Sequence, residues 1–128
     1  MNNIFWIKRG NKITAVKPAK ILYIKGNKYG CCIYFYPSNK SSTRKTIISS
    51  GTLIYFENIL KIYGFIRCHR NYLVNPLLIE EYCIEKSSIC IGRQIVPVSK
   101  RKKSILLRFV FEDKLTKNHH AICLKTAF

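Results

Sequence analysis

The chain has 128 residues, and its 23 Lys and Arg against 6 Asp and Glu give a formal net charge of +17. A hydrophobic content of 48% supports one folded domain and excludes a disordered polyelectrolyte. No Asp or Glu precedes Glu57, whereas the first 56 residues contain ten Lys or Arg. This imbalance is typical of a protein that holds a polyanion. Solubility alone is one alternative. An anionic membrane surface is another, but it would need a basic amphipathic helix, and these basic residues are scattered.

Strands are predicted through the first part of the chain. Aromatic and β-branched clusters separated by Gly, Asn and Lys place them at 4–8, 12–16, 20–25, 29–36 and 44–49. The first two form a hairpin around Gly10, and the basic loop from Lys25 to Tyr29 joins the next two.

Helical spacing begins at residue 52. Apolar side chains recur at steps of three and four, and they are Leu53, Phe56, Ile59, Leu60 and Tyr63. Gly64 stands where a helix-ending glycine is expected. The pattern predicts a short helix that packs on the core.

Short strands and a second helix are predicted after it. The strands are 65–68, 72–74, 78–86, 89–91 and 94–98. Asn75-Pro76 breaks the chain, Gly92-Arg93 closes a hairpin, and Pro97 places the last strand at an edge. Ser99 is a favoured N-cap, and the helix stripe that follows is Ile105, Leu106, Phe109 and Val110.

The compartment is inferred from segments that the sequence lacks. No apolar run is long enough to span a membrane, and the first residues do not resemble a secretion signal, so we expect a cytoplasmic protein with reduced thiols. The six cysteines are Cys31, Cys32, Cys68, Cys83, Cys90 and Cys123, and they form no C-x-x-C pair. His119, His120 and Cys123 make one metal half-site without a partner, so no metal is expected.

Catalysis lacks its usual residue patterns. The six acids are all expected at solvated positions, and His69 has no evident nucleophile or orienting acid beside it. No Gly-rich phosphate loop occurs in the sequence. We therefore expect a protein that is not an enzyme, with no cofactor and no small-molecule substrate.

The most unusual charge run is Ser99-Lys100-Arg101-Lys102-Lys103. A cation in the first turn of a helix opposes the helix dipole and costs about 0.3–1 kcal/mol. The run makes sense where an anion such as a DNA phosphate docks against the free N–H groups of the helix start. A solvated basic turn without a ligand is the alternative.

The segment from Phe65 to Asn75 mixes apolar anchors with polar side chains. Arg70 and Asn71 flank the turn between its two strands and are expected to face outward, and these residue types read base edges. Arg67 and His69 have two readings, either as further contacts or as side chains that satisfy hydrogen bonds in the core.

These segments together resemble the LytTR-type (LytR/AgrA-like) DNA-binding domain, the output module of many bacterial response regulators. The match covers about residues 16–111. It comprises Phe65-Ile66-Arg67-Cys68-His69-Arg70-Asn71-Tyr72-Leu73-Val74-Asn75, Ile95-Val96-Pro97-Val98-Ser99-Lys100-Arg101, and Ile21-Leu22-Tyr23-Ile24 with the loop that follows.

The resemblance implies a mostly β fold, an elongated array of antiparallel β-sheets with two short helices. It divides the chain into a hairpin-like lead (1–17), the DNA-binding domain (18–111) and a tail (112–128). It also implies loops that enter the major groove, with contacts at these positions: Lys28, Tyr29, Arg70, Asn71, Lys100, Arg101 and Lys102.

Three features distinguish this sequence from many members of the family. His69 is followed by Arg70 and Asn71 where many members carry His-Arg-Ser or His-Asn-Ser, and the long Arg should shift base preference toward G. Most members follow a receiver domain or membrane helices, whereas here we expect a stand-alone protein. Some relatives use a Cys at the position of Cys68 as an oxidation switch. Arg67 and Arg70 should lower its pKa, although Val96 occupies the resolving position.

The sequence therefore predicts a sequence-specific regulator of transcription that binds double-stranded DNA. We expect two copies on repeated half-sites, and no membrane partner. The alternative is a sequence-tolerant RNA- or single-stranded-DNA-binding module, or a protein-interaction module, in which exposed aromatic side chains would stack on the ligand.

Overall fold

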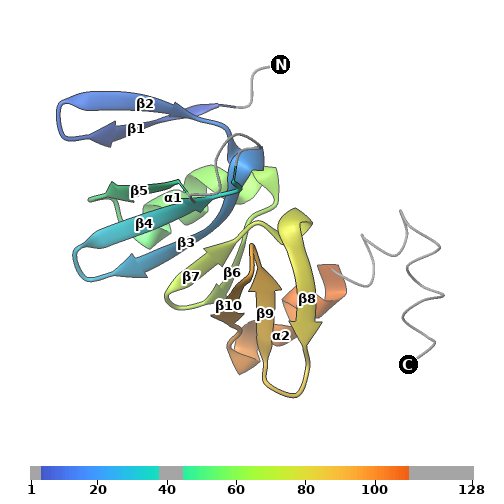
Figure 1. Cartoon of the computed structure of the whole chain (residues 1–128). Coiled ribbons are helices and arrows are strands. Elements are labelled where there is room, and N and C mark those ends of the chain that lie inside the picture. The colour runs from blue at the N-terminus through green and yellow to red at the C-terminus, as the bar shows by residue number, and fades with distance from the viewer. Residues whose placement is uncertain (1–3, 38–44, 110–128) are drawn as a thin grey trace.

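The computed structural model describes residues 4–37 and 45–109. Antiparallel sheets follow one another through the molecule and two α-helices pack against them (Figure 1), which confirms the predicted mostly β class. The helices are α1 (Leu53–Leu60) and α2 (Lys100–Arg108). The described strands are β1 (Phe5–Arg9), β2 (Lys12–Val16), β3 (Ile21–Asn27), β4 (Gly30–Phe35), β5 (Thr46–Ser49), β6 (Ile66–His69), β7 (Tyr72–Val74), β8 (Ile79–Cys83), β9 (Ser88–Ile91) and β10 (Gln94–Pro97).

Three sheets contain these strands. β1 and β2 form a hairpin, β8, β9 and β10 form a three-stranded sheet, and the central sheet has the order β5-β4-β3-β7-β6. β3 pairs with β7, which lies far away in the chain, and this pairing joins the two halves of the domain. As predicted from Pro97, β10 is an edge strand.

The central sheet is covered on both faces. One core cluster joins Ile7 and Val16 of the hairpin to the central sheet and to Phe56 of α1. The other joins Leu22 and Val74 to the three-stranded sheet and α2. Because both faces are buried, Ile21 to Ile24 are all buried in succession, without the alternation of a half-exposed strand.

The tight turn at Gly92-Arg93 forms as predicted. Both residues have positive φ, 57° and 65°, the backbone of a type I′ hairpin turn. A Cβ on Gly92 would lie 2.5 Å from Cδ1 of Leu22, so packing as well as backbone conformation favours glycine there. The turn therefore attaches the three-stranded sheet closely to β3.

The helices also form where the spacing predicts them, with two corrections. The predicted stripe extends to Tyr63, but α1 ends at Leu60 and a 3-10 helix (Lys61–Tyr63) leads to Gly64. Leu53, Phe56 and Leu60 are buried, whereas Ile105 of α2 is 48% exposed and does not belong to the buried stripe. Leu106 alone is buried among the described residues of α2, because this helix covers the sheet with a narrower face. Val110 and the tail 112–128 lie outside the described residues. No helix in the described part has the length and apolar character of a membrane span.

Candidate nucleic-acid interface

The turn between β6 and β7 is held from beneath by Arg67. Its Nη1 donates to Oε1 of Glu57 at 2.8 Å, its Nε donates to the carbonyl oxygen of His69 at 3.2 Å, and its Nη2 donates to the carbonyl oxygen of Arg70. All three bonds are internal and the side chain is 20% exposed. Arg67 was predicted either to contact DNA or to satisfy internal hydrogen bonds, and the structure shows the internal hydrogen bonds. These bonds fix the backbone of the turn.

His69 and Gly26 hold the same turn from its other sides. Nδ1 of His69 accepts a hydrogen bond from the backbone N–H of Asn71 at 3.1 Å, and the His69 ring meets Tyr72 edge-on. The carbonyl oxygen of Asn71 accepts from the N–H of Gly26 at 2.8 Å. With the backbone fixed, the side chains of Arg70 and Asn71 stand exposed at the tip.

The start of α2 lies beside this turn. The N–H of Ser99 donates to the carbonyl oxygen of Cys68 at 2.8 Å, so the helix begins against β6. Ser99 occupies the predicted N-cap position, but its side chain makes no capping hydrogen bond. The predicted basic run fills the first turn, where no acid occurs, and Lys100 and Arg101 are exposed. The partial positive charge of the helix start thus adds to four cations.

An open hollow of about 410 Å³ lies between the two elements. Its lining residues come from α1, the β6–β7 turn and the start of α2, and they are Glu57, Arg67, His69, Arg70, Ser99, Arg101 and Lys102. Three of the predicted contact residues, Arg70, Arg101 and Lys102, thus meet at one site although about thirty positions separate them in the chain. Asn71 and Lys100 are exposed next to residues that line it.

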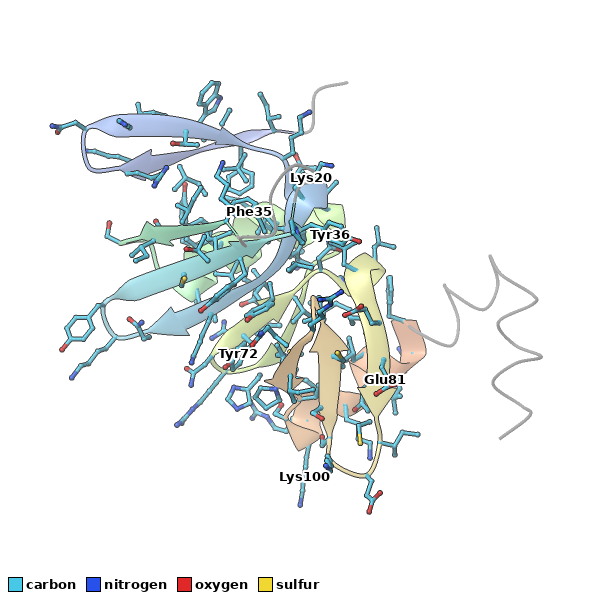
Figure 2. All side chains as sticks on the ribbon, in the orientation of Figure 1. Lys20, Phe35, Tyr36, Tyr72, Glu81 and Lys100 are labelled. Atoms are coloured by element: carbon cyan, nitrogen blue, oxygen red, sulfur yellow. The ribbon has the colours of Figure 1, made fainter. Side chains whose placement is uncertain are left out.

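The third predicted segment is the turn between β3 and β4. Oδ1 of Asn27 accepts from the N–H of Tyr29 at 2.7 Å, which orders the turn, and Tyr29 is 80% exposed. Nζ of Lys28 lies 5.1 Å from the centroid of the Tyr29 ring. This turn and the β6–β7 turn point to the same side of the molecule (Figures 1 and 2), but Lys28 and Tyr29 do not line the hollow.

Glu57 is the member of this site that the sequence analysis missed. It was expected to be solvated, yet it is partly buried and holds Arg67. One signal was available, because Glu57 follows Leu53 by four residues and precedes Leu60 by three, the spacing of the buried stripe. An acid on the packing side of a helix in so basic a chain indicates a partner cation.

Cys68 lies behind the turn in the second core cluster. It is fully buried, its Sγ lies 3.6 Å from the carbonyl oxygen of Pro97, and burial raises its pKa to about 12. The expectation that Arg67 and Arg70 lower this pKa is wrong, because burial removes the water that would stabilise a thiolate. The thiol is therefore protonated, which weakens its candidacy as a redox switch.

The structure describes only part of the chain in which a metal site could form. Among residues 4–37 and 45–109, no three His, Cys, Asp or Glu side chains are grouped as metal ligands are. The half-site of His119, His120 and Cys123 lies outside the described residues.

Comparison with known proteins places the chain in a family. The model of the LytTr DNA-binding domain matches residues 11–110, which is most of the chain and includes part of the N-terminal hairpin. A solved LytTr DNA-binding domain, from a response regulator of Bacillus cereus, superimposes with a TM-score of 0.62 at 23% identity, covering 85% of this chain and 96% of that one. Comparison with curated proteins found no match. The chain belongs to the LytTR family of DNA-binding domains.

Proposed function

We propose that the β6–β7 turn, the start of α2 and the β3–β4 turn form one surface that binds double-stranded DNA and reads its sequence. The observation that carries this is the hollow that Arg70 shares with Arg101 and Lys102. It combines a rigid turn, a helix start and three cations that make no ion pair with the described acids, which are the features of a phosphate and base-edge site.

The helix start is assigned to phosphate. Four cations in the first turn of α2 oppose its dipole, so they reduce the stability of the free protein. A phosphate docked there would meet Lys100, Arg101 and Lys102 together with helix N–H groups that the Ser99 side chain leaves uncapped. Binding would then turn an unfavourable charge arrangement into a favourable one.

The β6–β7 turn is assigned to base edges. Arg70 and Asn71 extend from a backbone that Arg67, His69 and Gly26 hold in place, so little ordering entropy is lost when DNA binds. Arg pairs in bidentate fashion with G, and Asn pairs with A. We propose that this turn and the β3–β4 turn with Lys28 and Tyr29 enter the major groove, and that two copies occupy repeated half-sites.

Selection of binding sites from random duplex DNA, followed by a salt titration, tests this function. With about six to eight phosphates contacted, the logarithm of affinity should fall with the logarithm of salt concentration at a slope near −5 to −7. The selection should return one motif present in two copies. No enriched motif, or a flat salt response, would overturn the proposal.

One observation favours a second candidate function. The 80% exposure of Tyr29 beside Lys28 would also suit stacking on an unpaired base. Competition between the selected duplex and its separate strands distinguishes the two functions. If the single strands displace the duplex at equal concentration, the chain is a single-strand binder.

A further inference from the structure

The N-terminal hairpin has an unfavourable charge arrangement that the proposed interface does not use. Its last cross-strand pair places Arg9 directly opposite Lys12, and both side chains are exposed. Like charges at opposed positions destabilise a strand pair. Neither side chain makes an ion pair with an acid in the described part of the chain. As at the start of α2, an arrangement that weakens the free protein suits the binding of an anion.

The hairpin is fixed to the rest of the domain. Ile7 and Val16 are each 3% exposed and belong to the core cluster that contains the central sheet and α1. Arg9 lies two residues beyond Ile7 on the same strand, so its position follows from that packing. The backbone positions that carry the two cations are therefore fixed relative to the central sheet.

The turn of the hairpin faces the same side as the proposed DNA surface. In Figure 1 the β1–β2 turn and the β3–β4 turn both point to the left, and the β6–β7 turn and the start of α2 follow below them. A duplex that crosses the last three would extend toward the first. The chain positions that carry the four tips are far apart, yet the fold places them along one side.

We infer that the hairpin turn, through Arg9 and Lys12, is an additional phosphate-binding site that lengthens the DNA contact beyond the turns that read bases. This inference rests on the proposed function and extends it. The ligand is the backbone of flanking DNA, so the site adds affinity and salt dependence and adds no preference for sequence.

The test compares the salt dependence of the full chain with that of Arg9→Gln/Lys12→Gln on a duplex that carries one selected half-site with long flanks, so that one copy binds. Loss of two phosphate contacts should make the slope less negative by about 1.8. Lys17→Gln/Lys20→Gln is the matched control, because it removes the same charge at the end of the hairpin opposite the turn, where Figure 2 shows Lys20. Its slope should equal that of the wild type. The exchange Arg9→Lys/Lys12→Arg should also preserve the slope.

Shortening the duplex from each end identifies the DNA that the hairpin contacts. Removal of one flank should give the wild type the slope of Arg9→Gln/Lys12→Gln, and it should leave that variant unchanged. Equal slopes for wild type and variant on the long duplex would overturn this inference while the proposed function stands. A wild type whose affinity ignores salt would overturn both.

Discussion

The two helices of this domain begin in opposite ways. α1 begins at a Thr52 side chain that accepts a hydrogen bond from the Tyr55 N–H at 3.1 Å, and it buries three apolar side chains. α2 begins at Ser99, which makes no such bond, continues with four cations, and buries Leu106. α1 follows the rules that stabilise a helix, and α2 departs from them where the hollow opens. Residues that break the rules of local stability are expected at ligand-binding sites.

The largest expected effect is a loss of folding stability when the core beneath α1 is altered. Phe56 is 1% exposed, so Phe56→Ala should lower the free energy of unfolding by about 3–5 kcal/mol. Denaturant unfolding measures it. Ile62→Ala is the control, since Ile62 is 82% exposed and should change stability by less than about 0.5 kcal/mol. Similar losses for both variants would contradict the core position of Phe56.

At the hollow we expect substitutions to weaken DNA binding without lowering stability. Arg70→Ala and Arg101→Ala should each weaken binding to the selected duplex by about 1–3 kcal/mol and leave the free energy of unfolding nearly unchanged. Both side chains are exposed, and the hydrogen bond at Arg70 uses its backbone oxygen. Lys86→Ala, in the exposed β8–β9 turn, is the matched control. Equal losses on selected and random duplexes would reduce Arg70 to a phosphate contact.

The caps of the two helices offer a direct comparison. Thr52→Ala removes an observed capping bond and should cost about 1 kcal/mol of stability. Ser99→Ala removes a side chain without such a bond and should cost only a few tenths of that. Thermal or denaturant unfolding of the two variants checks the order. A larger loss at Ser99 would show that its hydroxyl caps α2 in solution.

The smallest effect near neutral pH is expected at Cys68, where α2 meets β6. Its pKa of about 12, against an ordinary value of 9.0, keeps the native thiol protonated at pH 8. Alkylation at that pH should leave Cys68 unmodified in the folded protein, while the partly exposed Cys83 reacts. Between about pH 9 and 12 the unfolded thiol loses its proton first, so stability should fall as pH rises. Rapid native alkylation of Cys68, followed by peptide mass spectrometry, would contradict this.

The turns and the helix starts could be predicted because their chemistry is local. Gly64 and Gly92 adopt the positive φ that their positions require. α1 begins at Leu53, the first residue of the predicted stripe, and α2 begins directly after the predicted cap Ser99. The sheet order could not be predicted, since the pairing of β3 with β7 depends on contacts between distant segments. The same reason explains the errors at Glu57, Ile105 and Cys68. Their burial depends on what packs against them, and sequence neighbours do not report that.

In the candidate site, too, local features could be predicted and contacts between distant segments could not. The charge run at Lys100 to Lys103 and the exposed pair Arg70 and Asn71 were visible in the sequence because residue type and local position define them. That Arg70 and Arg101 share one hollow became evident only from the fold. The domain limits at residues 17 and 111 stay a prediction, since the family match begins inside the hairpin lead.

The central claim is that the cations at the start of α2 bind DNA phosphate and lower the stability of the helix in the free protein. The measurement is the salt dependence of affinity for Lys100→Gln/Arg101→Gln/Lys102→Gln beside the wild type, with the free energy of unfolding of both proteins. The account predicts a slope less negative by about 2–3 and an unchanged or raised stability. An unchanged slope together with lower stability would contradict it.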